Sequence, residues 1–123
     1  MTQVRFVLDT NVLLSAALFK NSLARKAFDV VVTSASEIIL SIPVLEELTD
    51  VLSRSRFDRY VSIEIRNQFL ADFLELVEMV DITRTAQFIL TNDKDLLVLN
   101  PYESISIVEP VYFLAMRLDR IEN

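Results

Sequence analysis

Acidic side chains follow two apolar runs of this sequence, at the point where each run ends. Residues 88–97 read FILTNDKDLL, so Asp93 and Asp95 come directly after a segment typical of a buried strand. Near the start, residues 4–8 form a similar run, and Asp9 follows it. Ligands of an open parallel sheet bind beyond the carboxyl ends of its strands, so these carboxylates are the first candidates for chemistry.

A third acidic group lies on a helix expected after another short apolar run, IIL. Ser41 or Ile42 is the predicted cap of this helix, and Pro43 lies in its first turn, where the missing donor costs nothing. At about 100° per residue, Glu46 projects nearly opposite the apolar arc and Glu47 lies on its border. We therefore expect Glu46 in solvent and Glu47 leaning over the edge of the sheet. The residues of the arc are Val44, Leu45, Leu48, Val51 and Leu52.

Carboxylates gathered at one edge repel each other unless a cation lies among them. Asp9, Glu47 and Asp93, with Asp95 beside them, offer the oxygen ligands that Mg²⁺ or Mn²⁺ prefers. Such ions assist the attack of water on a phosphodiester. The chain has no histidine and no cysteine, which leaves carboxylates as the catalytic acids, bases and ligands. Taken singly, each acidic cluster is better explained by helix capping, so only their joint placement indicates a metal site.

Composition limits the class of protein. The 123 residues predict a single domain over 1–123, with no membrane-spanning run and no signal peptide, and we expect a cytoplasmic protein. The formal net charge of −6 repels nucleic acid at long range, so any RNA contact must be local. The absence of glycine excludes Gly-rich phosphate loops. It also assigns turns with positive φ to asparagines, and the candidates are Asn11, Asn92 and Asn100.

The expected elements alternate between strand and helix. Strands are predicted at residues 4–8, 38–40, 79–82, 88–90 and 105–108, and helices at 12–19, 22–34, from 43, at 62–78, 94–100 and 110–120. Strands that are apolar throughout indicate an α/β fold with a mainly parallel sheet covered on both faces. Only residues 83–87 separate two of the strands, too few for a crossover helix. Either these two strands are not parallel neighbours or the connection is unusual.

Three segments together resemble the PIN-domain family, in particular its toxin branch from toxin-antitoxin systems. They read VRFVLDTNVLLSAALF, LSIPVLEELTDVLSRSRFDRY and FILTNDKDLLVLNPYESISIVEP, and they occur in the order typical of the family. The resemblance implies a three-layer α/β/α fold and a metal-dependent endoribonuclease that acts on RNA. It also implies an antitoxin partner and, as in many relatives, a homodimer.

The resemblance assigns roles to individual residues. It makes Asp9, Glu47 rather than Glu46, and Asp93 the catalytic and metal-binding acids, with Asp95 as a neighbouring ligand. Supporting hydrogen-bond roles fall to Thr10, Asn11, Thr91 and Asn92.

One part of the family pattern is absent. Relatives carry a segment before the last acidic motif that supplies a further acidic ligand and a crossover helix, and here VEMVDITRTAQFILTND leaves no room for it. Asp81 is a weak substitute for that ligand. A degenerate, catalytically inactive PIN-like module that acts through protein or RNA binding is therefore the alternative. Loss of the helix should also uncover apolar surface of the sheet, to be covered by a second copy in a homodimer or by the helix at 62–78 folding back.

Basic residues near the middle of the chain are candidates for RNA contact. Phe57 and Tyr60 lie among them and suit base stacking. The alternative is that the arginines complement a helix C-terminus and solvate the surface. The candidate cations are Arg54, Arg56, Arg59 and Lys94.

Overall fold

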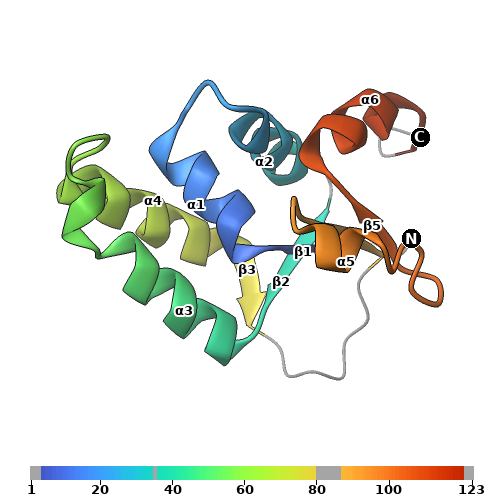
Figure 1. Cartoon of the computed structure of the whole chain (residues 1–123), viewed down its shortest axis with the longest axis horizontal. Coiled ribbons are helices and arrows are strands. Elements are labelled where there is room, and N and C mark those ends of the chain that lie inside the picture. The colour runs from blue at the N-terminus through green and yellow to red at the C-terminus, as the bar shows by residue number, and fades with distance from the viewer. Residues whose placement is uncertain (1–3, 35, 80–86, 121–123) are drawn as a thin grey trace.

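The chain has a mixed α/β fold around one five-stranded sheet, consistent with the predicted α/β/α class (Figure 1). A computed structural model describes residues 4–34, 36–79 and 87–120. The strands are β1 (Arg5–Leu8), β2 (Glu37–Leu40), β3 (Val77–Met79), β4 (Phe88–Leu90) and β5 (Ser106–Val108). The helices are α1 (Thr10–Leu18), α2 (Leu23–Thr33), α3 (Ile42–Leu52), the 3₁₀ turn η1 (Ser55–Phe57), α4 (Ile63–Leu76), α5 (Lys94–Leu97) and α6 (Pro110–Arg120).

The order of the strands places a switch point beside β1. The sheet runs β3-β2-β1-β4-β5, and all four neighbouring pairs are parallel. The chain therefore builds outward from β1 to β3, then returns to the other side of β1 for β4 and β5. Ligands of such sheets bind in the crevice where this direction changes, outside the carboxyl ends of the strands. In this sheet the direction changes between β1 and β4, so the candidate binding edge is at their carboxyl ends.

The main core lies between one face of the sheet and helices α1, α2, α3, α4 and α6. Phe6 of β1 stacks on Phe88 of β4 at 5.1 Å between ring centroids, and Phe113 of α6 meets Phe6 edge-on at 5.4 Å. Phe73 of α4 and Phe28 of α2 belong to the same buried cluster. These helices fix the direction in which β1 and β4 present their carboxyl ends.

Helix α4, which we call the arm helix, ends earlier than predicted. Residues 62–78 were expected to form one helix, but α4 ends at Leu76 and the chain continues directly into β3. Of the apolar residues of this helix, Phe73 is buried, whereas Ile65 and Leu76 are exposed. Arg66, next to Ile65, is 1% exposed and takes an interior place that the apolar pattern had not indicated. The helix predicted at 94–100 is likewise shorter, because α5 ends at Leu97.

The prediction that asparagines occupy the turns with positive φ was wrong. Asn11 lies inside α1, and neither Asn92 nor Asn100 has positive φ. Over the described ranges, Glu103 is the residue with positive φ, at 54°. It lies in a tight turn where Tyr102 and Ile105 exchange backbone hydrogen bonds of 3.1 and 2.9 Å.

The unusual connection is explained by the strand order. β3 pairs with β2 and β4 pairs with β1, so the two strands flanking the short connection are not neighbours. Between their described ends the chain has too few residues for a crossover helix. Asp81 and part of the strand predicted at 79–82 lie outside the described residues.

The second face of the sheet is a row of apolar side chains. Pairing register aligns Val7 of β1 with Ile89 of β4 and Ile107 of β5. The neighbours of Val7 and Ile89 along β1 and β4 belong to the main core. Because Phe73 of α4 packs in that core, the arm helix does not fold back over the second face, and this alternative was wrong. A second copy of the chain stays a prediction. No helix among the described residues is long and apolar enough to cross a membrane.

Candidate active site

Asp9 occupies the switch point and is oriented from the neighbouring strand. It follows β1 directly, and its backbone N–H donates to the carbonyl of Leu90 at 2.9 Å. Asp9 is the N-cap residue of α1 by position, but its side chain makes no capping hydrogen bond. Instead, Asp9 Oδ2 accepts a hydrogen bond of 2.7 Å from the hydroxyl of Thr91. Helix capping therefore does not explain this carboxylate.

Thr91 connects Asp9 to the acidic turn after β4. Its side chain is fully buried, and its hydroxyl both donates to Asp9 and accepts from the backbone N–H of Asp93 at 3.0 Å. The N–H of Thr91 donates to the carbonyl of Val108 at 3.0 Å, which fixes the residue against β5. One hydroxyl thus holds the two acidic elements together across the switch point.

Replacing Thr91 by valine should cost stability because it deletes both hydrogen bonds while keeping the shape of the side chain. We expect the free energy of unfolding to fall by about 1–3 kcal/mol, since the partners at Asp9 and Asp93 lose a bond in a partly buried place. Urea unfolding of Thr91→Val measures this. Thr33→Val is the matched control, because the Thr33 hydroxyl is exposed at the end of α2, and it should change stability by less than about 0.5 kcal/mol. Equal values for the two variants would contradict the role of Thr91.

Asp93 is partly explained by capping. It is the N-cap residue of α5, and its Oδ1 accepts from the N–H of Asp95 at 2.9 Å. Asp93, Lys94 and Asp95 are exposed. Helix capping therefore explains one carboxylate oxygen of Asp93. The turn still places the carboxylates of Asp93 and Asp95 at the same edge as Asp9.

Glu47 lies on α3, whose start agrees with the sequence. Ser41 is the N-cap residue and accepts from the N–H of Val44, and Pro43 lies in the first turn. Glu46 is exposed as expected, but Glu47 is exposed as well, so burial does not separate the two. Nowhere in ranges 4–34, 36–79 and 87–120 do three acidic side chains lie close enough together to hold a metal ion. The part of Glu47 in the site stays a prediction.

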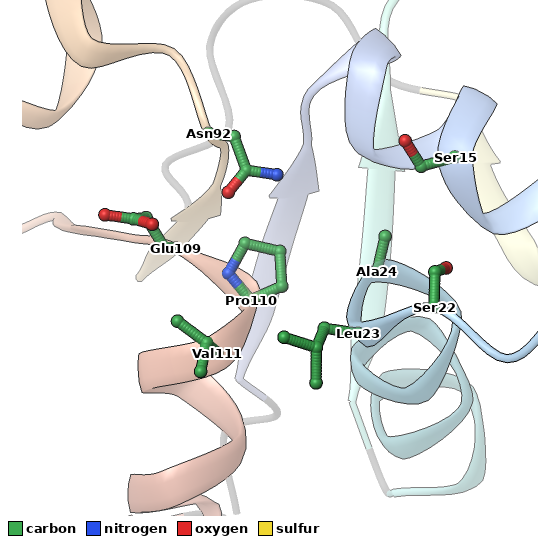
Figure 2. A pocket seen from close by; sticks show the side chains of 8 residues that line it. All are labelled: Ser15, Ser22, Leu23, Ala24, Asn92, Glu109, Pro110 and Val111. Carbon is green, nitrogen blue, oxygen red and sulfur yellow. The ribbon is translucent and has the colours of Figure 1, made fainter.

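The other predicted supporting residues lie close to Asp9 and Thr91 in the chain. Thr10 is buried at the start of α1, and Asn11 is exposed one residue later. Asn92 follows Thr91 and lines a pocket of about 300 Å³ between the start of α6 and the helices α1 and α2. Figure 2 shows the Asn92 amide pointing across this pocket toward α1 and α2.

Glu109 is an acidic residue at this edge that the sequence analysis missed. It follows β5 as Asp9 follows β1, so the same rule of acids after apolar runs would have found it. It lines the same pocket, but its carboxylate is turned away from Leu23 and Ala24 across the opening (Figure 2). No lysine or arginine lines the pocket, so its lining suits an uncharged group better than a phosphate. The remaining lining residues are Ser15, Ser22, Pro110 and Val111.

The predicted basic contacts separate into two groups. Arg54, two residues after the end of α3, forms an exposed ion pair with Asp50 of that helix at 2.9 Å. Arg56 and Arg59 lie in the connection between α3 and α4, over the rings of Phe57 and Tyr60. Arg54, Arg56 and Arg59 therefore belong to a different part of the chain from Asp9. Of the predicted basic residues, only Lys94 directly follows an acid of the candidate site.

Comparison with known families identifies the fold and the site together. A family model described as the PIN domain matches residues 5–95, which is well over half of the chain and includes Asp9, Glu47, Asp93 and Asp95. The chain therefore belongs to the PIN-domain family, a nuclease-type family whose members generally depend on divalent metals. No curated protein matches the chain.

The residues at this edge would suit one loosely held divalent ion better than a closed cage. Asp9 and Asp93 would offer hard oxygen ligands from two elements joined by Thr91. Among the ion pairs of the described residues, none involves Asp9, Glu47 or Asp93, so lysine and arginine do not neutralise these acids. Mg²⁺ commonly binds through one or two carboxylates and keeps several waters, which matches this pair.

Proposed function

We propose that this PIN-domain protein is an endoribonuclease that uses Mg²⁺ or Mn²⁺ to hydrolyse RNA phosphodiesters. The observation that carries the proposal is the hydrogen-bonded path from Asp9 through Thr91 to Asp93 across the switch point. It holds a carboxylate that is not needed as a helix cap at the edge where parallel α/β sheets bind ligands.

In this proposal each residue of the path has a separate task. Asp9 and Asp93 would hold the ion, with Glu47 and Asp95 as additional oxygen ligands, and the bound ion would supply charge stabilisation to the phosphoryl group. Thr91 keeps Asp9 in one orientation, so the carboxylate need not reorganise when RNA binds. The chain contains no histidine, and the carboxylates are thus the groups that can accept a proton from the attacking water.

The family resemblance extends the proposal to a biological setting. We infer a cytoplasmic toxin that is restrained by an antitoxin protein and that forms a homodimer through apolar surface such as that at Val7 and Ile89, which are half-buried. These partners are inferred from the resemblance and from the apolar face.

Metal-dependent cleavage tests the function directly. The wild-type protein should cleave single-stranded RNA with Mn²⁺ and stop when the ion is chelated. Glu47→Gln should slow cleavage by about 10-fold or more if Glu47 helps to hold the ion, whereas the adjacent Glu46→Gln should cleave as the wild type does. Loss of activity in both glutamine variants would point to α3 itself rather than to one ligand. Cleavage that persists in chelator would refute the proposal.

A non-catalytic PIN module is the second candidate. It is favoured by the lack of a group of three acids in the described ranges and by the short connection between β3 and β4. An intact wild type that binds RNA but leaves it uncut with Mn²⁺ would select this candidate.

A further inference from the structure

The connection between α3 and α4 carries a small basic and aromatic pocket, which we call the arm tip. Its lining residues are Arg56, Phe57, Arg59 and Tyr60, and its volume is about 290 Å³. The guanidinium carbon of Arg56 lies 4.9 Å from the centroid of the Phe57 ring, and that of Arg59 lies 5.0 Å from the Tyr60 centroid. Both arginines are exposed, and the Tyr60 ring is 48% exposed, so a ligand can reach charge and ring together.

The carboxylates near the arm tip are paired with other arginines. Asp50 binds Arg54 at 2.9 Å, and Asp58 binds Arg66 at 2.9 Å. Within the part of the chain that the structure describes, neither Arg56 nor Arg59 forms an ion pair. The arm tip is thus a local excess of positive charge on a protein whose formal net charge is −6.

The backbone of the arm tip is held in place from inside. The buried guanidinium of Arg66 donates to the carbonyls of Leu52 and Val61, at either end of the connection, and to Asp58 within it. The N–H of Tyr60 donates to the carbonyl of Phe57 at 3.0 Å. The rings and cations are therefore presented by a fixed turn, which lowers the entropy lost when a ligand binds.

The first helix connects the arm tip to the acidic edge. Asp9 precedes α1 and Phe19 follows it, and the ring of Phe19 meets Tyr60 edge-on at 5.3 Å. In Figure 1 the arm tip and the end of β1 lie at opposite ends of α1. Nine residues of helix span about 14 Å, and stacked nucleotides rise about 3.4 Å each. A strand of about four nucleotides therefore reaches from one point to the other, at the lower end of known single-strand site sizes.

We propose that the arm tip is an anchor for single-stranded RNA. A base stacks on the exposed face of Tyr60, while Arg56 and Arg59 bind the phosphates on either side of it. Every base has a face that stacks on an aromatic ring, so this anchor selects single strands without selecting a sequence. Its link to the cleavage edge rests on the proposed function, but binding at the arm tip does not require cleavage.

Binding measured without metal separates this inference from the nuclease proposal. A fluorescent ten-nucleotide RNA is titrated in chelator, and its anisotropy is followed at several salt concentrations. The double variant Arg56→Ala/Arg59→Ala should weaken binding at least 10-fold and reduce the slope of log affinity against log salt by about 1.4, because two phosphate contacts are lost. Arg54→Ala is the matched control, since it removes the same charge from the same arm but from an existing ion pair, and it should retain the affinity.

The aromatic part has its own test. Tyr60→Ser should weaken binding about 10-fold without changing the salt slope, while Tyr60→Phe, which keeps the ring, should bind as the wild type does. An unchanged affinity and slope in the double variant would overturn the anchor. A wild-type affinity in Tyr60→Ser would overturn it too, because charge alone would equally fit an acidic peptide. Normal binding together with absent cleavage would refute the nuclease and leave the anchor standing.

Discussion

Replacing Asp9 by asparagine should reduce Mn²⁺-dependent RNA cleavage at least about 100-fold. Asparagine has the same shape, and its amide oxygen can still accept the hydrogen bond from Thr91, so the fold around the switch point is retained. The change removes the negative charge alone. The measurement is initial rate with a labelled single-stranded RNA, comparing wild type and variant with Mn²⁺ and in chelator.

Asp95→Asn is the matched control for Asp9→Asn, because it removes one negative charge from the same edge of the sheet. Asp95 is exposed at the same edge, and its contact to Asp93 is made by its backbone N–H, which the substitution leaves intact. It should lower the rate by no more than about 10-fold, as expected for a peripheral ligand. Thermal unfolding gives an independent readout, because Mn²⁺ should raise the Tm of the wild type by mass action and should fail to do so for Asp9→Asn. An equal Tm rise in both proteins would show that the ion binds elsewhere.

Much of the architecture follows from the apolar runs and the residues after them. The strands around Phe6, Ile38, Phe88 and Ile107 are all present and parallel, since runs that are apolar on both faces form interior strands. The same runs locate Asp9 and Asp93 at one edge, because parallel strands end on the same side. The joint placement at this edge could therefore be predicted without knowledge of the order of the strands.

Other features of the site depend on that order. The family resemblance assigns Thr91 a supporting hydrogen-bond role, but the sequence does not name its partner. Its bond to Asp9 exists because β4 pairs with β1 rather than with β3. Strand order is set by long-range packing, which local pattern does not encode. The prediction of positive φ at asparagines was wrong for a related reason. Helix α1 begins directly after Asp9, and no residue of positive φ is needed there.

The arm helix shows how a polar residue can take an interior place. Apolarity alone favours an interior place for Ile65 over Arg66, but Ile65 is 60% exposed and Arg66 is buried. The turn of the arm leaves carbonyl groups of Leu52 and Val61 without helical partners, and buried carbonyls must find donors. A guanidinium offers several donors in fixed geometry, which an isoleucine cannot.

Arg66→Met should accordingly be among the most destabilising substitutions in the chain. Methionine fills similar space but donates no hydrogen bond, so the carbonyls held by Arg66 stay buried without a partner, and we expect a loss of about 3–5 kcal/mol in the free energy of unfolding. The ion pair with Asp58 contributes little to this figure, because that carboxylate is largely exposed. Urea unfolding monitored by circular dichroism measures the loss.

Arg54→Met is the control that separates the effect of burial from the effect of charge in Arg66→Met, because both arginines lie in or next to the same connection between α3 and α4. This substitution also removes an ion pair with an aspartate, but the pair of Arg54 with Asp50 is exposed. The free energy of unfolding should therefore fall by less than about 1 kcal/mol. Similar losses for the two variants would mean that the carbonyls around Arg66 find other donors. If Arg66 holds the arm tip as well as the fold, Arg66→Met should also weaken metal-free RNA binding at temperatures where it remains folded, although Arg66 itself is too buried to touch RNA. The salt dependence of that binding should then fall as it does when Arg56 and Arg59 are removed, because both phosphate contacts depend on the turn that Arg66 supports.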